Sequence, residues 1–371
     1  MSNDLKYTSI HYNEYLQVDK ILDAQKLRSV EVEGKVAHEE MLFIITHQVY
    51  ELWFKQIIHE IESINEMFDD GYLSATESIT CVNRLDRMVE IIKLTIQQIS
   101  VLETMTPLDF LDFRNYLFPA SGFQSFQFRE IEVMLGLKNE QRHTYHNTPY
   151  HAVFDEKKQA RLKELEDGKS MLQQVETWLE RTPFLEFEGF DFIEHYKKAV
   201  RSMLNKEQAA IKSTTILSEK YKEMRLTMLG DTDSYFGYIF DEEKYNELVE
   251  AGTAKMSYKA TVAALLINLY RDEPIFQQPF QLLNKLVEVD EFLTTWRYRH
   301  AQMVLRMLGK KVGTGGSSGH EYLSKTASEH QIFKDLHNIS TFLIPRSDLP
   351  ELPEELKAQL NFHFSTQKKN A

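Results

Sequence analysis

Residues 40–64 read EMLFIITHQVYELWFKQIIHEIESI, and this stretch decides the fold class. Its large apolar and aromatic side chains recur every three or four positions, at Phe43, Tyr50, Phe54, Ile58 and Ile61. That spacing places them on one face of an α-helix. The pattern continues on both sides and predicts one helix over residues 36–67.

Three helix-start signals follow in the next part of the chain: Ser74 with Glu77, Thr106 with Pro107 and Asp109, and Ser121 with Gln124. The first and the last are capping-box pairs. In the second, threonine can cap the helix, proline suits its first position, and the aspartate suits the positive end of the helix dipole. We expect helices over residues 75–105, 108–117 and 122–136, the last one stopped by Gly136.

Helical patterns continue through the second half of the chain, over residues 158–181, 191–228, 241–250, 257–271, 280–308 and 326–338. No stretch has a convincing strand pattern, and 14 Gly with 9 Pro are few for a strand-and-turn protein. Residues 137–157 are polar, rich in histidine and not periodic, so they are predicted to form a loop or lid. Since there is no repeat or low-complexity linker, we expect residues 1–371 to form one all-α unit.

The composition limits the possible partners and the compartment. A formal net charge of -13 disfavours nucleic acid and anionic membranes, because both require clustered Lys and Arg. The N-terminal MSNDLKYTSI lacks signal-peptide features, and no apolar run approaches the ~20 residues of a membrane span. A cytoplasmic protein is therefore expected. Cys81, the single cysteine, lies in a helical pattern, which favours an inert buried thiol over a nucleophile.

His300 lies in an apolar helical stripe formed by Val289, Leu293, Trp296, His300, Val304 and Met307. A buried imidazole costs free energy unless its nitrogens find partners, so a hydrogen-bonded core histidine is one interpretation. The other is an axial ligand to haem iron, which needs a neutral imidazole on a rigid helix in an apolar site. Zinc is disfavoured, since no HExxH motif or paired Cys/His spacing surrounds His300.

Two further polar residues lie on apolar faces. His47 shares a helix face with Phe43, Tyr50 and Phe54, so it could flank a flat cofactor or be a hydrogen-bonded core residue. Arg114 follows Phe110 by four positions, where a guanidinium could hold a carboxylate through two parallel hydrogen bonds. An internal salt bridge is the alternative for Arg114.

The segment GKKVGTGGSSG, residues 309–319, contains five of the 14 glycines. It has no GxxxxGK[ST] motif and follows a helix instead of opening one, which disfavours a nucleotide site. Either the loop approaches a ligand closely, with Thr314, Ser317 and Ser318 as polar contacts, or it is a flexible connector. A di-iron bundle is also disfavoured, because the one ExxH match, Glu140 to His143, falls in the polar loop.

Four segments together resemble the tryptophan 2,3-dioxygenase family: residues 40–64 quoted above, DFRNYLFPASGFQSFQFREIE from Asp112, WRYRHAQMVLRMLGKKVGTGGSSGHEYL from Trp296, and STFLIPR from Ser340. They occur in the family's order, and the similarity runs from about Tyr12 to Arg346. The resemblance implies an all-helical homotetramer with one haem b per subunit. It also implies the oxidative opening of the indole 2,3-bond of L-tryptophan by O2, which gives N-formyl-L-kynurenine.

The resemblance also implies roles for individual residues. His300 corresponds to the axial ligand of the haem iron, with Trp296 beside it. His47 corresponds to the residue that hydrogen-bonds the indole N–H, and Phe43 packs next to it. Gly315 of the glycine-rich segment is expected to contact the haem.

Further matches concern the amino-acid end of the substrate. Arg114 corresponds to the clamp for the substrate carboxylate, in a wall completed by Phe110, Leu117 and Ser121. Thr314 corresponds to the contact of the substrate ammonium group.

The N-terminal segment, residues 1–30, is implied to reach the site of a neighbouring subunit through Tyr12 and Tyr15. Two positions depart from many family members, which have glycine at Asn13 and tyrosine at His320. These departures leave the reaction class in place but put the fine substrate preference in doubt.

Two other functions remain as alternatives. One is a related histidine-ligated haem enzyme that mono-oxygenates or hydroxylates another indole or aromatic amino acid. The other is a helical interaction protein without catalytic activity, which would bind no haem.

Overall fold

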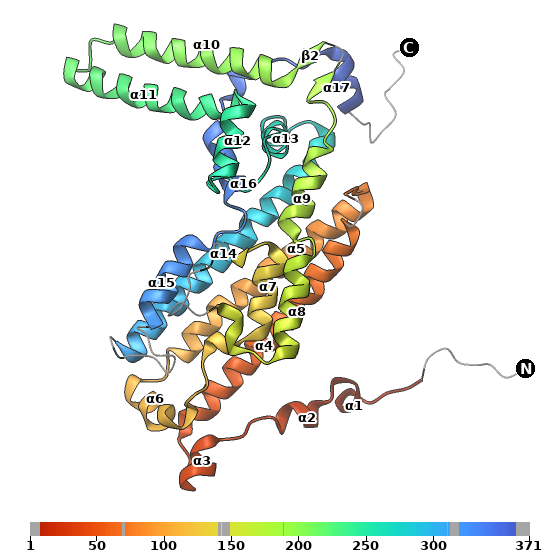
Figure 1. Cartoon of the computed structure of the whole chain (residues 1–371), viewed down its shortest axis with the longest axis vertical. Helices are drawn as coiled ribbons and strands as arrows, with labels where there is room; N and C mark the ends of the chain where they lie inside the picture. Colours follow the sequence, from red (N-terminus) through yellow and green to blue (C-terminus); the bar gives the residue numbers. More distant parts are fainter. Residues whose placement is uncertain are drawn as a thin grey trace, which may run out of the picture.

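The computed structural model describes residues 8–68, 71–139, 142, 149–187, 189–309, 311 and 319–360. Within these ranges the chain is an elongated helical bundle in which α4 (His38–Met67), α5 (Ala75–Leu102), α7 (Phe126–Leu135) and α14 (Gln277–Leu308) lie side by side (Figure 1). α15 (Gly319–Glu329) packs along α14. The prediction of an all-α fold is confirmed.

The helix predicted over residues 36–67 is α4, and its apolar stripe lies in the core. Tyr50, Phe54 and Ile61 are all buried. The Ser74–Glu77 capping box opens α5 as predicted: the Glu77 amide donates to Ser74 Oγ at 3.2 Å, and the Ser74 amide donates to Glu77 Oε2 at 2.9 Å. α5 packs against both α4 and α14 and so forms the middle of the bundle.

The opposite end of the bundle is built from shorter helices: α9 (Met171–Glu180), α10 (Phe192–Ser213), α11 (Glu219–Ile239), α12 (Glu242–Glu250), α13 (Tyr258–Leu269), α16 (Lys334–Asn338) and α17 (Glu354–Leu360). Figure 1 shows α10 and α11 as a hairpin lying across this end, far from α6 (Pro107–Arg114). α13 contacts α9, α14 and α16 and thereby joins the two parts.

Three helices predicted as continuous are each divided in two. The one predicted over residues 326–338 forms the end of α15, which stops at Glu329, and α16, which begins at Lys334. The pattern over residues 158–181 forms α8 (Glu156–Asp167) and α9, because the chain is extended at Gly168 and Ser170 restarts a helix with a capping box to Gln173. The pattern over 191–228 forms α10 and α11, with Thr214 extended after α10 and Ser218 preceding α11. The apolar periodicity is nearly in register across the breaks at Gly168 and Thr214, so it did not reveal them.

Two predictions about local structure need correction. The Ser121–Gln124 capping box exists, but it closes only the turn η2 (Gly122–Gln124), and α7 starts at Phe126 with Ser125 as its N-cap. A short antiparallel hairpin, β1 (Glu186–Phe187) with β2 (Phe190–Asp191), also precedes α10, although no strand was predicted. Strands of two residues are too short to show a period of two.

The remaining elements are α1 (Tyr12–Leu16), α2 (Val18–Leu22), α3 (Arg28–Glu33), η1 (Asn115–Leu117), η4 (Tyr150–Val153), η5 (Pro274–Phe276), η6 (Ile339–Phe342) and η7 (Arg346–Asp348). Glu40 fixes the N-terminal segment to α4, because its carboxylate accepts hydrogen bonds from the amides of Arg28 and Ser29. Of the predicted loop at residues 137–157, positions 140, 141 and 143–148 lie outside the described residues; the loop ends in η4 and the first turn of α8.

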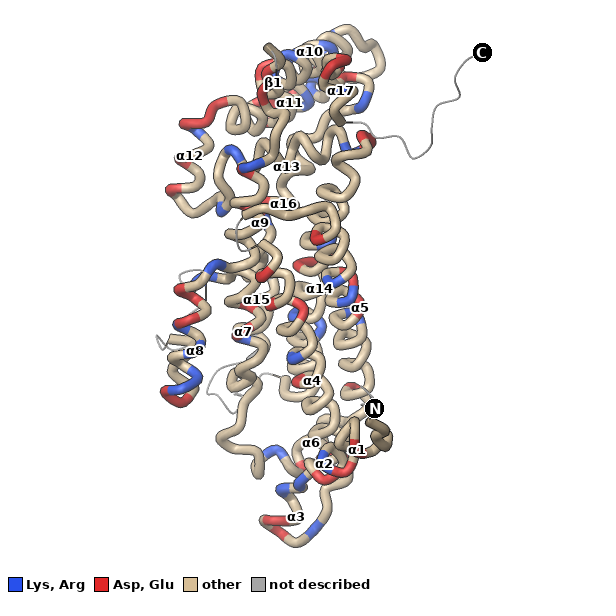
Figure 2. The backbone as a smooth tube through the Cα atoms, turned by 90° about the vertical axis from the view of Figure 1, so that its right-hand side faces the viewer, with Lys and Arg blue, Asp and Glu red and all other residues tan. Residues whose placement is uncertain are grey.

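Helix α8 shows how charged residues mark a surface helix. Figure 2 shows acidic and basic residues distributed along α8, whose single buried residue is Leu162. In contrast, Cys81 on α5 is fully buried, and burial raises the pKa of its thiol to about 12, as expected for an inert core residue. No helix within the described ranges is long and apolar enough to cross a lipid bilayer.

Candidate active site

A cavity of about 550 Å³ lies between α4, α6, α7, α14 and α15. Eight residues that the sequence singled out line its wall: Phe43, His47, Phe110, Arg114, Leu117, Ser121, Trp296 and His300. The wall is mostly apolar, and the volume lies within the range of sites for small molecules and cofactors. The structure therefore brings together side chains from helices that are far apart in sequence.

His47 lies on α4 one turn after Phe43, and the two rings are 4.1 Å apart. Its Nδ1 donates a hydrogen bond to the Phe43 carbonyl oxygen at 2.7 Å. Burial lowers the pKa of His47, although the Phe43 carbonyl and the charge of Glu51 act in the opposite direction. In the neutral ring, the proton on Nδ1 leaves Nε2 as a hydrogen-bond acceptor.

His300 lies near the C-terminal end of α14. Burial, assisted by the electrostatic effect of His47, lowers the pKa of His300 to about 4, so the ring is neutral near pH 7. Its Nδ1 is buried and has no hydrogen-bond partner among the described residues. These residues therefore do not supply the two hydrogen bonds that an ordinary core histidine would need.

Trp296 precedes His300 by one helical turn and stacks on it, with ring centroids 5.2 Å apart and an angle of 22° between the planes. The indole is itself enclosed by three rings: Tyr50 at 6.2 Å, Phe54 at 6.1 Å and Phe128 at 5.0 Å between centroids. Since each ring restricts the next, this packing fixes the orientation of the His300 imidazole.

α6 carries Arg114, the third polar side chain that the sequence singled out on an apolar helix face. Thr106 and Asp109 form a capping box with Pro107 at the start of the helix, and Phe113 anchors it in the core. Phe110 and Arg114 are one turn apart and both line the cavity. A guanidinium and an apolar ring on the same wall can accommodate a ligand that carries both a carboxylate and an aromatic group.

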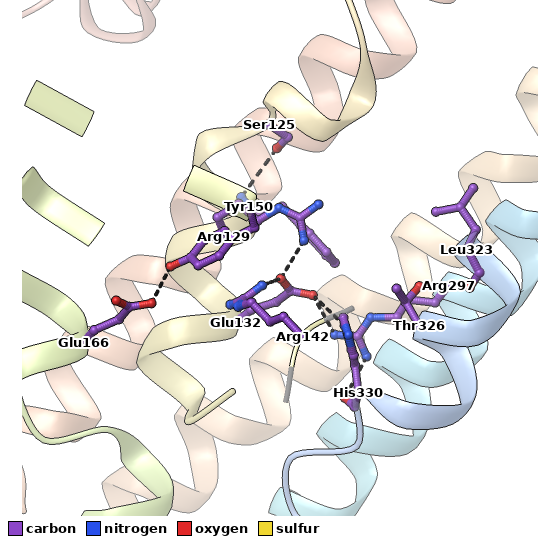
Figure 3. Close-up of polar contacts among 11 residues, drawn as sticks. Ser125, Arg129, Glu132, Arg142, Tyr150, Glu166, Arg297, Leu323, Thr326 and His330 are labelled. Atoms are coloured by element: carbon purple, nitrogen blue, oxygen red, sulfur yellow. Dashed lines mark hydrogen bonds and ion pairs between the residues drawn. The ribbon is translucent and has the colours of Figure 1, made fainter. Parts of the chain in front are cut away.

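Sequence reasoning missed a buried ionic cluster, which we call the Glu132 cluster: Arg129, Glu132, Arg142, Arg297 and His330 (Figure 3). All of its members except Arg142 line the cavity. Glu132 Oε2 accepts from Arg129 at 2.8 Å and from Arg142 at 2.6 Å, and Oε1 accepts from Arg297 at 3.1 Å. His330 Nδ1 lies 3.8 Å from Oε1. Burial alone would raise the pKa of Glu132, but the arginine charges hold it well below its usual 4.5.

One signal for this cluster was present in the sequence. Arg129 and Glu132 are three residues apart in the apolar stretch FREIEVML, where charged residues are out of place unless they are paired. The partners Arg142 and Arg297 could not be found in this way, because they come from a polar loop and from a helix far along the chain.

The other predicted site residues divide into two groups. Thr314 and Gly315, with the rest of residues 312–318, lie outside the described residues, as do Glu140 and His143. Tyr12 and Tyr15 are described, but they are 69% and 71% exposed and do not line this cavity. A contact of the two tyrosines with a neighbouring subunit stays a prediction.

The residues present fit a haem. His300 is a neutral imidazole in a largely apolar cavity, and its buried ring nitrogen lacks a partner among the described residues; this is the environment of a haem axial ligand. No group of three or more His, Cys, Asp or Glu that could hold a metal ion occurs among the described residues.

Comparison with known proteins gives a consistent result. The profile of the family described as "Tryptophan 2,3-dioxygenase" matches residues 2–343. A tryptophan 2,3-dioxygenase of Bdellovibrio bacteriovorus is 47% identical over 360 residues, which cover 97% of this chain and 100% of the relative. Similar enzymes of Dictyostelium discoideum (49% identical; 96% of this chain and 89% of the relative) and Mayetiola destructor (47%; 96% and 91%) also match.

Proposed function

Since the chain belongs to the tryptophan 2,3-dioxygenase family, we propose that it binds haem b and cleaves the indole 2,3-bond of L-tryptophan with O2, forming N-formyl-L-kynurenine. The reaction is the first step of tryptophan catabolism along the kynurenine pathway. When bound, the haem supplies the site at which dioxygen is activated. The chain's own residues bind the substrate, orient it and exclude water.

One observation carries this proposal: His47 and His300, from α4 and α14, line the same apolar cavity together with Arg114. The two imidazoles influence each other electrostatically, since His47 contributes to the lowered pKa of His300. A flat cofactor between them would have one axial imidazole and one substrate-side imidazole. We assign His300 to the iron and His47 to the substrate side.

The protonation state of His47 supports its role. Because Nδ1 donates to the Phe43 carbonyl, Nε2 can accept a hydrogen bond from the indole N–H of tryptophan. Phe43 and Phe110, whose centroids are 5.7 Å apart, add an apolar wall for the indole ring. Together they orient the ring and exclude water from it.

Arg114 would hold the substrate carboxylate, and Thr314 its ammonium group. Binding the carboxylate and the ammonium group at two separate points would fix the position of the indole relative to the haem. We further propose a homotetramer in the cytoplasm, in which Tyr12 and Tyr15 complete the site of a neighbouring subunit.

A spectroscopic and product assay tests the function. The purified protein, supplied with haem, should give a Soret band that shifts when L-tryptophan is added. With 18O2, both labelled atoms should appear in N-formyl-L-kynurenine. One labelled atom would instead favour the mono-oxygenase alternative, and a colourless protein that takes up no haem would contradict the proposal.

A further inference from the structure

The Glu132 cluster contains more positive than negative charge. Three guanidinium groups, those of Arg129, Arg142 and Arg297, contact one carboxylate. His330 adds no negative charge, so the cluster itself has a surplus of two positive charges. Asp290, which acts electrostatically on Arg297, lies outside the cluster, and burial raises its pKa. Buried charges are normally paired, because an unpaired ion in a low-dielectric environment is costly.

These groups are deeply buried and only partly satisfied. Arg297 is 2% exposed and Arg142 7% exposed. Arg297 Nε and Arg142 Nε and Nη2 are buried without a hydrogen-bond partner among the described residues. Guanidinium donors in this situation favour an anion that supplies further oxygen acceptors.

Two of the three guanidinium groups belong to residues in the wall of the ligand cavity. Arg129 and Arg297 both line the cavity that contains His300. Arg297 precedes His300 by three residues on α14, so the two side chains are neighbours on the helix surface. An anion at Arg297 would therefore lie close to any group that occupies the His300 side of the cavity.

We propose that the cavity wall formed by Arg129 and Arg297 is a carboxylate-binding site that takes the propionate groups of the haem. This inference rests on the proposed function, because a haem carries two propionates and thus the two negative charges that the cluster lacks. Glu132 keeps the guanidiniums in place and neutralises the third charge. Arg129 and Arg297 would thus hold the haem at its carboxylates, in addition to the single contact that His300 would make with the iron.

The test compares two porphyrins on the unaltered full-length apoprotein. Iron protoporphyrin IX and its dimethyl ester have the same ring and iron, but the ester lacks both carboxylates. The wild-type protein should bind the free acid about 10–100-fold more tightly in an equilibrium titration, as expected for charge-assisted hydrogen bonds. Equal affinities would overturn the inference while leaving the proposed function intact, whereas binding of neither porphyrin would contradict both.

Two substitutions test which residues cause the preference for the free acid over the dimethyl ester. Arg297→Leu should remove most of the preference for the free acid, and Arg129→Leu serves as a second variant if circular dichroism shows that Arg297→Leu has lost helix. Arg299→Leu is the matched control, since Arg299 lies on the same helix but pairs with Glu103 at 3.1 Å and does not line the cavity. If both test variants keep the wild-type preference, the carboxylates are bound elsewhere and the inference is wrong.

Discussion

The cavity end of the bundle and the junction of α9, α13, α14 and α16 both bury carboxylates, but with different partners. At the cavity, Glu132 is surrounded by cationic side chains. At the junction, Asp290 accepts hydrogen bonds from the amides of Ile332 at 2.9 Å and Phe333 at 3.0 Å. Asp335 likewise accepts from the amides of Lys255 and Met256.

The two kinds of donor, backbone amides at Asp290 and guanidiniums at Glu132, suit different roles of a buried carboxylate. Backbone amides hold a loop against a helix without adding charge of their own, which suits a junction that holds the fold together. Arg297 and His337, whose Nε2 lies 3.9 Å from Asp290 Oδ2, act on Asp290 only electrostatically. Guanidiniums add net charge, which suits a wall that faces a ligand. Burial raises the pKa of Asp290, whereas the arginines depress that of Glu132, so the same functional group behaves differently at the two places.

The largest effect should come from removing the axial imidazole. We expect His300→Ala to lose the histidine-ligated haem spectrum and turnover while the helical content stays unchanged, because His300 contributes to the cavity wall more than to the core. His195→Ala is a matched control, since His195 lies on α10 at the other end and contacts Phe190. A normal haem spectrum and activity in His300→Ala would contradict the assignment.

Replacing Glu132 should cost the most folding stability. Glu132→Gln leaves three buried guanidiniums without their carboxylate, so the free energy of unfolding of the apoprotein should fall by about 3–5 kcal/mol. Denaturant unfolding followed by circular dichroism measures this change. Glu90→Gln is the control, because the exposed pair of Glu90 with Lys93 should contribute less than about 1 kcal/mol. Equal losses in both variants would contradict the difference between buried and exposed pairs.

Arg114→Ala should weaken the binding of tryptophan without changing the stability of the fold. Loss of a buried charge pair to the tryptophan carboxylate should weaken tryptophan binding by about 2–5 kcal/mol. Indole, which has no carboxylate, is the built-in control and should bind as it does to the wild type. Equal weakening for tryptophan and indole, measured by titration of the haem spectrum, would show that Arg114 supports the cavity shape instead.

The smallest expected effect is the pH dependence of the free energy of unfolding, which should have opposite signs for Glu132 and Asp290. The lowered pKa of Glu132 means that its contribution to stability is present above about pH 4.5 and is lost as the pH falls below that value. The raised pKa of Asp290 means that its contribution decreases as the pH rises above 3.8 toward the folded-state pKa. We expect the stability difference between wild type and Glu132→Gln to grow with pH, and that between wild type and Asp290→Asn to shrink. Unfolding titrations over roughly pH 3–6 test this, and slopes of the same sign would contradict it.

Most of the fold could be predicted from local patterns. The periodic stretch of α4 and the capping boxes of α5 and α6 depend on residues within one or two turns, which the sequence displays directly. The breaks at Gly168 and Thr214 were missed, because the apolar period continues across them. The hairpin before α10 was missed because two residues cannot display a period.

The candidate site was predictable to the extent that each residue was unusual for its own helix. His47, Arg114 and His300 are polar groups on apolar faces, and all three line the cavity. The cluster around Glu132 depends on Arg297, 165 positions away, and on Arg142 in a non-periodic loop. Only the three-dimensional arrangement brings these charges together.

α14 is a single helix of 32 residues that carries Asp290, Arg297 and His300. Since each residue turns the helix by about 100°, one inserted or deleted residue between Asp290 and His300 would swing the imidazole out of the cavity while the Asp290 anchor stayed in place. The separation of about 15 Å between Asp290 and His300 along the helix axis is therefore set by the number of residues between them. A change of chain length within this interval is therefore incompatible with activity.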